Sequence, residues 1–286
     1  MLVAITGANG FVGSHLGEFL VKNKVSVKGL VRAGREDAVK YFGGEACTVD
    51  YFDFESLMEA LDGVSVVYHF AGTTQQTKSV TFEKDYLQLG KNVIEACKNS
   101  GVRKIIINSG LGVEKYGKSN KYFWSRMMME DAIKNSGLAY TIFRPSTIIG
   151  SGHELVPDDE LTPNILQELN QGKVSIIGDG KNLFQPIFIQ DAVRIYHACL
   201  EKFDENIFDL VGPNKIRMLD YVKLVAKQLG IKPRLEFKSL EEARKQLTQE
   251  EIDILVLSET ADHRILEKAF GIKLTLVENA VKEMLG

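Results

Sequence analysis

Residues 2–13 read LVAITGANGFVG, and the fold is predicted from this stretch. Its first half is typical of a buried strand, and it leads through a glycine-rich turn into the apolar pattern of a helix that starts near Phe11. In such a turn Gly7 adopts a conformation in which a Cβ would clash, Gly10 lets the backbone approach a ligand, and Gly13 lets the helix pack on the strand. The N–H groups of the first helical turn attract negative charge, so the stretch predicts a pyrophosphate site.

The composition is that of an ordinary globular protein. The 286 residues are 44% hydrophobic and 26% charged, which allows one large domain or two modest ones. A formal net charge of −3 gives no reason to expect a nucleic acid partner. The three cysteines, Cys47, Cys97 and Cys199, lie far apart without metal-ligand spacing, so we expect reduced thiols and no metal site.

The chain carries no pattern that predicts a membrane protein. No apolar run approaches the ~20 residues of a membrane span, and the glycine turn begins too early for a signal peptide ahead of it. We therefore expect a cytoplasmic protein with no membrane span.

Strand-like runs alternate with helical patterns through the first half of the chain. The expected strands are 25–31, 46–49, 64–70, 104–108 and 140–143, and the expected helices are 11–21, 56–61, 82–99 and 120–135. This alternation predicts an α/β fold with a parallel sheet, right-handed crossovers and helices on both faces. A ligand site is expected at the carboxyl ends of the strands, where the strand order reverses.

The motif TGANGFVG, residues 6–13, resembles the TGxxGxxG of the short-chain dehydrogenase/reductase superfamily. The likeness is to its extended and atypical branches, which include the epimerase/dehydratase proteins and the NADPH-binding accessory subunit of respiratory complex I. It implies a Rossmann-type doubly wound parallel sheet with a small C-terminal substrate lobe. We expect a dinucleotide-binding domain in residues 1–150 plus 174–205, and the substrate lobe in 151–173 plus 206–286.

The end of the second expected strand bears on the choice of cofactor. It holds Arg32, with Arg35 shortly after and no acid before Glu36. An acid here suits the ribose hydroxyls of NAD, whereas an arginine suits a 2′-phosphate. NADP(H) is therefore favoured over NAD(H), the alternative being that Arg32 is a solvated surface residue. Asp50, after the third strand, is either an acid beside the adenine or the cap of the helix around Ser56.

Two further motifs resemble cofactor contacts of the family. In Tyr68–Gly72, similar to H-x-A-G, Ala71 and Gly72 would touch the cofactor and His69 is expected to be a core residue. Phe143–Gly150 resembles R-P-x-x-x-x-G, whose backbone after the proline lies along the nicotinamide. The cofactor-binding residues that the resemblance implies are Gly7, Asn9, Gly10, Phe11, Val12, Gly13, Arg32, Arg35, Asp50, Ala71, Gly72, Tyr122, Arg126 and Pro145.

The catalytic residues of the family are a serine or threonine after the fifth strand and a Tyr-x-x-x-Lys on the next helix, where positions i and i+4 share a face. The matching residues here are Ser109, Tyr122 and Arg126. Arg126 replaces the lysine, and a guanidinium neither deprotonates near neutrality nor bonds with the geometry of an ammonium. Gly110 stands where many extended relatives have a second, active serine, so Ser109 either orients the substrate oxygen or points away from it.

Two functions are consistent with these residues. The first is an NADP(H)-dependent oxidoreductase or epimerase/dehydratase-like enzyme that acts on a small carbonyl or alcohol substrate by hydride transfer, with Tyr122 as acid/base. The second is a non-catalytic NADP(H)-binding protein with a structural or redox-sensing role, which Arg126 and Gly110 favour. Sugar-nucleotide relatives often carry an arginine where Leu183–Pro186 stands here, so a less charged or more apolar substrate is favoured.

The remaining expectations concern the second half of the chain and assembly. A polar loop from Ser151 leads to a helix at 163–169 and is expected to contribute to a substrate lid. Asp191 is expected to cap the helix 192–200. The family often dimerises through its fourth and fifth helices, so a homodimer is compatible with the resemblance. Trp124 and Met127–Met129 would supply either such a face or part of the core.

Overall fold

The computed structural model describes residues 1–152, 159 and 161–286. They form two compact units. The first contains residues 1–144 and 193–208, and the second contains 145–151, 161–192 and 209–286. The border falls inside helix α8 (Ile189–Ala198), whereas the division expected from the sequence kept 174–205 together. Most of the polar loop expected to form a lid lies outside the described residues.

The first unit is built on a seven-stranded sheet in the order β11-β6-β5-β4-β1-β2-β3. The strands are β1 (Leu2–Thr6), β2 (Ser26–Val31), β3 (Glu45–Thr48), β4 (Val66–His69), β5 (Lys104–Asn108), β6 (Ala139–Pro145) and β11 (Asn206–Leu210). All pairings from β3 across to β6 are parallel. The order reverses between β1 and β4, so the expected doubly wound parallel sheet is confirmed, with a switch point at the carboxyl end of β1.

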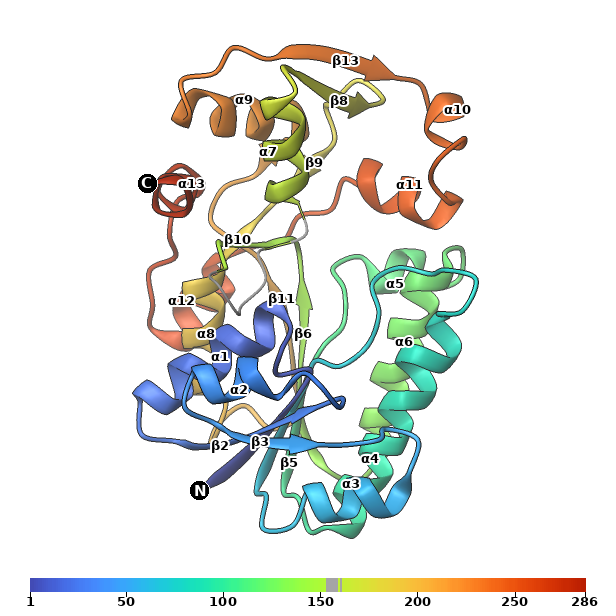
Figure 1. Ribbon diagram of the computed structural model, residues 1–286, viewed down its shortest axis with the longest axis vertical. Coiled ribbons are helices and arrows are strands. Elements are labelled where there is room, and N and C mark those ends of the chain that lie inside the picture. The colour runs from blue at the N-terminus through green and yellow to red at the C-terminus, as the bar shows by residue number, and fades with distance from the viewer. Residues whose placement is uncertain (153–158, 160) are drawn as a thin grey trace. The chain divides into compact units, whose positions relative to one another are not determined.

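Helices cover both faces of this sheet. They are α1 (Phe11–Lys22), α2 (Glu36–Tyr41), α3 (Phe54–Ala60), the π-helix η1 (Glu83–Gln88), α4 (Leu89–Asn99), α5 (Val113–Tyr116), α6 (Lys121–Lys134) and the second half of α8. Figure 1 shows α1 and α2 on one side of the sheet and α4 and α6 on the other. Under α4 and α6, Val93 and Ile133 pack with Val67 and Ile105 of the strands in one apolar core.

The strands agree with the sequence-based expectation to within two residues, but some helices differ. Helices α2 and α5 are short and were not predicted, and the helix expected at 82–99 divides into η1 and α4. Asp53 caps α3, because its Oδ1 accepts hydrogen bonds from the backbone N–H groups of Glu55 (3.0 Å) and Ser56 (3.5 Å). The alternative that Asp50 is this cap is therefore wrong.

The second unit contains three small two-stranded sheets and several helices. The strand pairs are β8 (Lys173–Ile177) with β13 (Arg234–Lys238), β7 (Ile148–Ile149) with β10 (Ile187–Phe188), and β9 (Leu183–Phe184) with β12 (Ile216–Arg217). The helices are α7 (Thr162–Asn170), the start of α8, α9 (Met218–Gln228), α10 (Leu240–Ala243), α11 (Gln249–Val256), α12 (Arg264–Phe270) and α13 (Val277–Leu285).

Asp191 lies inside a helix and not in front of it, which corrects the expected helix start at residue 192. Helix α8 already begins at Ile189, so Asp191 lies inside its first turn. The Asp191 carboxylate accepts hydrogen bonds from the backbone N (2.6 Å) and Oγ1 (3.1 Å) of Thr275. The aspartate therefore ties α8 to the segment that precedes α13, a contact between residues far apart in the chain.

Two further expectations can be compared with the described residues. None of their helices combines the length and the apolar character that crossing a bilayer requires. Of the residues considered for a dimer face, Met129 is fully buried, while Trp124 and Met128 pack partly buried against the core.

Candidate functional site

The glycine turn between β1 and α1 is a cradle made of backbone. Gly7 has φ +68°, and a Cβ there would lie 2.9 Å from the backbone N of Ala71. A Cβ on Gly13 would lie 2.3 Å from the carbonyl oxygen of Gly7. Gly10 N donates to that same oxygen at 2.9 Å, which closes the turn. At Gly7 and Gly13 only glycine is compatible with this turn.

The N-terminus of α1 presents backbone N–H groups without a side-chain cap. Its N-cap is Gly10, which offers no side-chain acceptor, and the first turn holds no acidic residue. Asn9, Phe11 and Val12 are only half-buried. The first N–H groups of a helix lack intrahelical acceptors and carry partial positive charge, so this end suits an anion such as a pyrophosphate.

Tyr51 supports the glycine turn from inside the protein, and the sequence did not predict this contact. Its buried hydroxyl donates to Leu30 O at 2.9 Å and accepts from Gly7 N at 3.3 Å. Its carbonyl accepts from Asn92 Nδ2 at 3.0 Å. The tyrosine thus links β2, the glycine turn and α4, and only its place directly after Asp50 could have drawn attention to it.

A cavity of about 460 Å³ lies at the carboxyl ends of β2 and β3. Arg32 lines it, is exposed, and makes no hydrogen bond or ion pair with any described residue. Asp50 also lines it, and the Phe52 ring is 44% exposed there, with Lys84 Nζ 5.5 Å from its centroid. An aromatic plane, an acid and an uncommitted guanidinium fit the adenosine end of a dinucleotide. The other lining residues are Ala33, Thr48, Val49, Tyr51 and Asp85.

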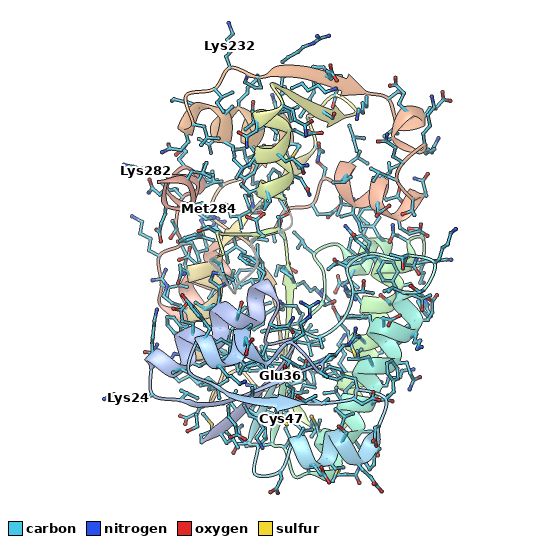
Figure 2. All side chains as sticks on the ribbon, viewed as in Figure 1. Lys24, Glu36, Cys47, Lys232, Lys282 and Met284 are labelled. Atoms are coloured by element: carbon cyan, nitrogen blue, oxygen red, sulfur yellow. The ribbon has the colours of Figure 1, made fainter. Side chains whose placement is uncertain are left out.

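The loop after β2 separates the two candidate arginines. Arg35 is the N-cap residue of α2 and is not among the residues that line the cavity. Glu36, labelled in Figure 2, accepts hydrogen bonds from Gly34 N (3.1 Å) and Thr48 Oγ1 (2.8 Å). Hydrogen bonds from its own backbone amide and from Thr48 lower the pKa of Glu36. The first acid after β2 is therefore already engaged with the loop.

His69, at the end of β4, is a buried structural residue, as the sequence suggested. Thr6 Oγ1 accepts from the backbone N–H groups of Phe70 (3.1 Å) and Ala71 (3.0 Å), so its own hydrogen is directed to His69 Nδ1 at 2.7 Å. Burial, together with the charge of Arg126, lowers the pKa of His69 to about 4. The imidazole is thus neutral near pH 7 and holds the strand end in place.

Tyr122 presents its hydroxyl to Gly110 at the end of β5. Asn120 caps α6 by accepting from Tyr122 N at 2.9 Å, which fixes the start of the helix. A Cβ on Gly110 would lie 3.6 Å from the Tyr122 hydroxyl oxygen. The ring packs edge-on against Phe82, with centroids 5.7 Å apart. Gly110 therefore faces the phenol, and a Cβ there would also lie 3.5 Å from Cε1 of the Phe123 ring.

Arg126 is buried between two tyrosine rings. Its side chain is only 4% exposed, with Cζ 3.3 Å from the ring centroid of Tyr86 and 4.4 Å from that of Tyr122. Nη2 donates to Thr73 O at 2.9 Å. Nη1 is buried and has no hydrogen-bond partner in the part of the chain that the structure describes. A buried N–H without an acceptor is unfavourable, so this atom fits an oxygen of a bound ligand.

Ser109 lies near a buried ion pair. Glu130 is held by Arg144 Nε (2.9 Å) and Nη2 (2.8 Å). Burial raises the pKa of Glu130, but the bonds from Arg144, with a smaller contribution from Ser109, outweigh it, so that pKa is lowered. The Ser109 hydroxyl is buried and makes no hydrogen bond of good geometry with a described residue. Pro145, the neighbour of Arg144, is the last residue of β6.

A family model described as the NAD dependent epimerase/dehydratase family matches residues 3–210. The human sterol-4-alpha-carboxylate 3-dehydrogenase, decarboxylating, is 28% identical over 227 residues, which are 71% of this chain and 58% of that protein. The mitochondrial NADH dehydrogenase (ubiquinone) 1 alpha subcomplex subunit 9 of Arabidopsis thaliana is 26% identical over 225 residues, 75% of this chain and 54% of that protein. The chain spans about six tenths of the length of the sterol dehydrogenases that it matches.

Solved structures share the fold. The UDP-glucuronic acid 4-epimerase of Bacillus cereus, in complex with UDP-glucuronic acid and NAD, aligns with a TM-score of 0.80 at 20% identity and covers 100% of this chain and 98% of that one. The family model includes the glycine turn, the strands β1 to β6 and the helix that carries Tyr122 and Arg126. The chain therefore belongs to the NAD dependent epimerase/dehydratase family.

Proposed function

We propose that the protein is an NADP(H)-dependent oxidoreductase acting on a small carbonyl or alcohol, with Tyr122 as the acid/base. The observation that carries this proposal is the Tyr122 hydroxyl, which faces Gly110 after β5, while Cζ of the buried Arg126 lies 4.4 Å from the centroid of the Tyr122 ring. A bound nicotinamide would supply or accept the hydride. Tyr122 would give or take the proton of the substrate oxygen, and Ser109 would hold that oxygen.

The chain's own residues support the cofactor part of this proposal. The turn from Gly7 to Gly13 and the N-terminus of α1 would hold the pyrophosphate through backbone N–H groups. Asp50 would lie beside the adenine. Arg32 would bind the 2′-phosphate, since its guanidinium has no other partner among the described residues and the next acid along the chain, Glu36, is engaged with Gly34 and Thr48.

The charge change Arg32→Glu is expected to weaken NADPH binding by about 10- to 100-fold, because a bidentate arginine–phosphate contact is replaced by repulsion. NADH binding should change by less than about threefold, since NADH has no 2′-phosphate. Titration calorimetry with both nucleotides measures the two affinities.

Arg35→Glu is the matched control for Arg32. It makes the same charge change on the same loop, but Arg35 does not line the cavity. We expect it to weaken NADPH binding several-fold less than Arg32→Glu does. If both variants lost NADPH affinity equally, the general change in surface charge would explain the loss. That result would contradict a specific phosphate contact at Arg32.

The substrate class is inferred from Gln185, which lies in the segment where sugar-nucleotide relatives often carry an arginine. Gln185 is fully buried, its Nε2 donates to Gly212 O at 2.7 Å, and its Oε1 accepts from Ala261 N at 2.9 Å. Both ends of its amide are used within the second unit, so it is unsuited to clamping a diphosphate. This supports a less charged, more apolar substrate, and the human relative is named as a sterol dehydrogenase.

Tyr122→Phe is expected to lower the rate of NADPH oxidation with a carbonyl substrate by about 10²- to 10⁴-fold, because it removes only the proton donor. NADPH affinity should stay within about threefold, since the ring that contacts Arg126 is kept. The rate is followed by nucleotide absorbance with a panel of small and sterol-like ketones.

Tyr116→Phe is the control for the loss of a tyrosine hydroxyl near this site. The Tyr116 ring packs against Phe123, with centroids 5.5 Å apart. Loss of the Tyr116 hydroxyl should leave the rate of NADPH oxidation nearly unchanged. If Tyr122→Phe retains the wild-type rate, the acid/base assignment is wrong.

A second candidate function, non-catalytic NADP(H) binding, is favoured by two observations beside Tyr122. Gly110 carries no hydroxyl beside the Tyr122 phenol, and the Ser109 side chain is buried near Glu130. A relative in Arabidopsis thaliana is named as a subunit of NADH dehydrogenase (ubiquinone). Wild-type protein that binds NADPH but reduces no carbonyl in the panel would support this second candidate over the first.

A further inference from the structure

The helix after β4 begins with an unusual turn that presents its side chains to two parts of the candidate site. Residues Glu83–Gln88 form the π-helix η1, which continues directly into α4. Lys84 and Asp85 line the cavity that holds Arg32, whereas the next residue, Tyr86, stacks on Arg126. Because π turns are rare and recur at functional sites, the position of Tyr86 in this turn indicates a role in the candidate site.

The Tyr86 ring is held on three sides. Its hydroxyl donates to Asn108 O at 3.2 Å, at the end of β5. Gly72, with φ +153°, leaves room for the ring, since a Cβ there would lie 2.6 Å from Tyr86 Cδ2. The remaining face carries the guanidinium of Arg126, 3.3 Å from the ring centroid. The Tyr86 ring is therefore held by a backbone carbonyl, by the close approach of Gly72 and by a side chain of α6.

This ring fixes the direction of the guanidinium. A planar cation that lies on an aromatic face keeps its N–H groups in one plane. Nη2 of Arg126 donates to Thr73 O at 2.9 Å, and this bond sets the rotation within that plane. Nη1 is then left as a buried donor in a defined direction, without a partner among the described residues. A lysine at this position would lack both the stacking plane and the second nitrogen.

We propose that Tyr86 is a positioning residue that holds Arg126 so that its Nη1 donates to a hydroxyl oxygen of the bound dinucleotide. This proposal rests on the cofactor proposed above. Tyr86 does not itself exchange protons: its hydroxyl is committed to Asn108 O, and burial raises the pKa of Tyr86 to about 12 even though Arg126 opposes the shift. Its effect on the ligand passes through Arg126.

A double-mutant cycle measured as NADPH affinity tests this. Tyr86→Leu removes the ring and should weaken binding about tenfold, and Arg126→Met should weaken it by at least as much. The double variant should bind no more weakly than Arg126→Met alone, because Tyr86 has no effect once the guanidinium is gone. Tyr86→Phe keeps the ring and should bind within about twofold of wild type.

Phe82→Leu is the matched control for lost packing. Phe82 is buried and its ring packs on Tyr122, so the variant removes a neighbouring ring without removing the stack on Arg126. It should bind NADPH like wild type. Circular dichroism checks folding, and Tyr86→Met, which keeps most of the volume, replaces Tyr86→Leu if the latter does not fold.

The outcomes separate this inference from the function on which it rests. Losses that add in the double variant, an unchanged affinity in Tyr86→Leu, or an equal loss in Phe82→Leu would overturn the role of Tyr86 while leaving the cofactor in place. Wild-type protein that binds neither NADPH nor NADH would overturn the proposed function itself.

Discussion

Gly13→Ala is expected to abolish measurable NADPH binding, with a loss on the order of 100-fold or more. The added methyl would lie 2.3 Å from Gly7 O and 3.0 Å from Ala8 Cα, both backbone atoms of the turn. No flexible side chain can move aside, so α1 must shift away from the turn. The N–H groups at the start of α1 then no longer converge on one anion. Titration calorimetry with NADPH measures the loss.

Gly17→Ala is the control on the same helix, one turn further on. A Cβ there would lie 2.4 Å from Cζ of the Phe42 ring, a side chain that can move, and the residue is remote from the turn. We expect a lower melting temperature but NADPH affinity within about threefold of wild type. If Gly17→Ala also abolished binding, general destabilisation of α1 would explain the result for Gly13→Ala.

Arg144→Met is expected to lower the free energy of unfolding by about 3 kcal/mol near pH 7, because it leaves the Glu130 carboxylate buried without its main partner. Glu130 is 2% exposed and receives two hydrogen bonds from Arg144, and Lys134, at 3.3 Å and partly exposed, remains to compensate. Urea unfolding can be followed by the fluorescence of Trp124, the single tryptophan of the chain, which lies on α6 with Glu130.

The same pair predicts a pH dependence. The pKa of Glu130 is lowered in the folded protein, so its ion pair contributes stability above the unfolded pKa, and that contribution is lost as the pH falls through the folded pKa. The difference in the free energy of unfolding between wild type and Arg144→Met should therefore be largest near neutrality. It should shrink toward zero below about pH 4. A difference that stays constant down to low pH would show that Arg144 stabilises by packing alone.

Glu114→Gln is the control for the exposed side of this network. Arg144 Nη1 also contacts Glu114 at 2.7 Å, but the Glu114 side chain is 78% exposed. Exposed ion pairs contribute about 0–1 kcal/mol, so this variant should unfold close to wild type. Comparable losses in Glu114→Gln and Arg144→Met would mean that burial of Glu130 is not the cause.

The sequence determined the fold and the position of the dinucleotide cradle. Strand and helix patterns and the turn at Gly7, Gly10 and Gly13 are local properties, because they depend on neighbours within a few residues. The same locality explains what was missed along the chain: α2 and α5 are too short for a periodic pattern, and Asp53 rather than Asp50 caps α3.

The tertiary structure decided how the candidate site is assembled. Tyr51 closes the cradle across 44 positions of sequence, and Tyr86 and Arg126 meet although they lie on different helices. The environment of Ser109, buried near Glu130, likewise depends on an arginine on another strand. Such contacts have no local signature, because each results from the packing of elements that only the folded sheet brings together. In the sequence, Arg126 only departs from the Tyr-x-x-x-Lys motif. In the structure, its guanidinium lies on the rings of Tyr86 and Tyr122.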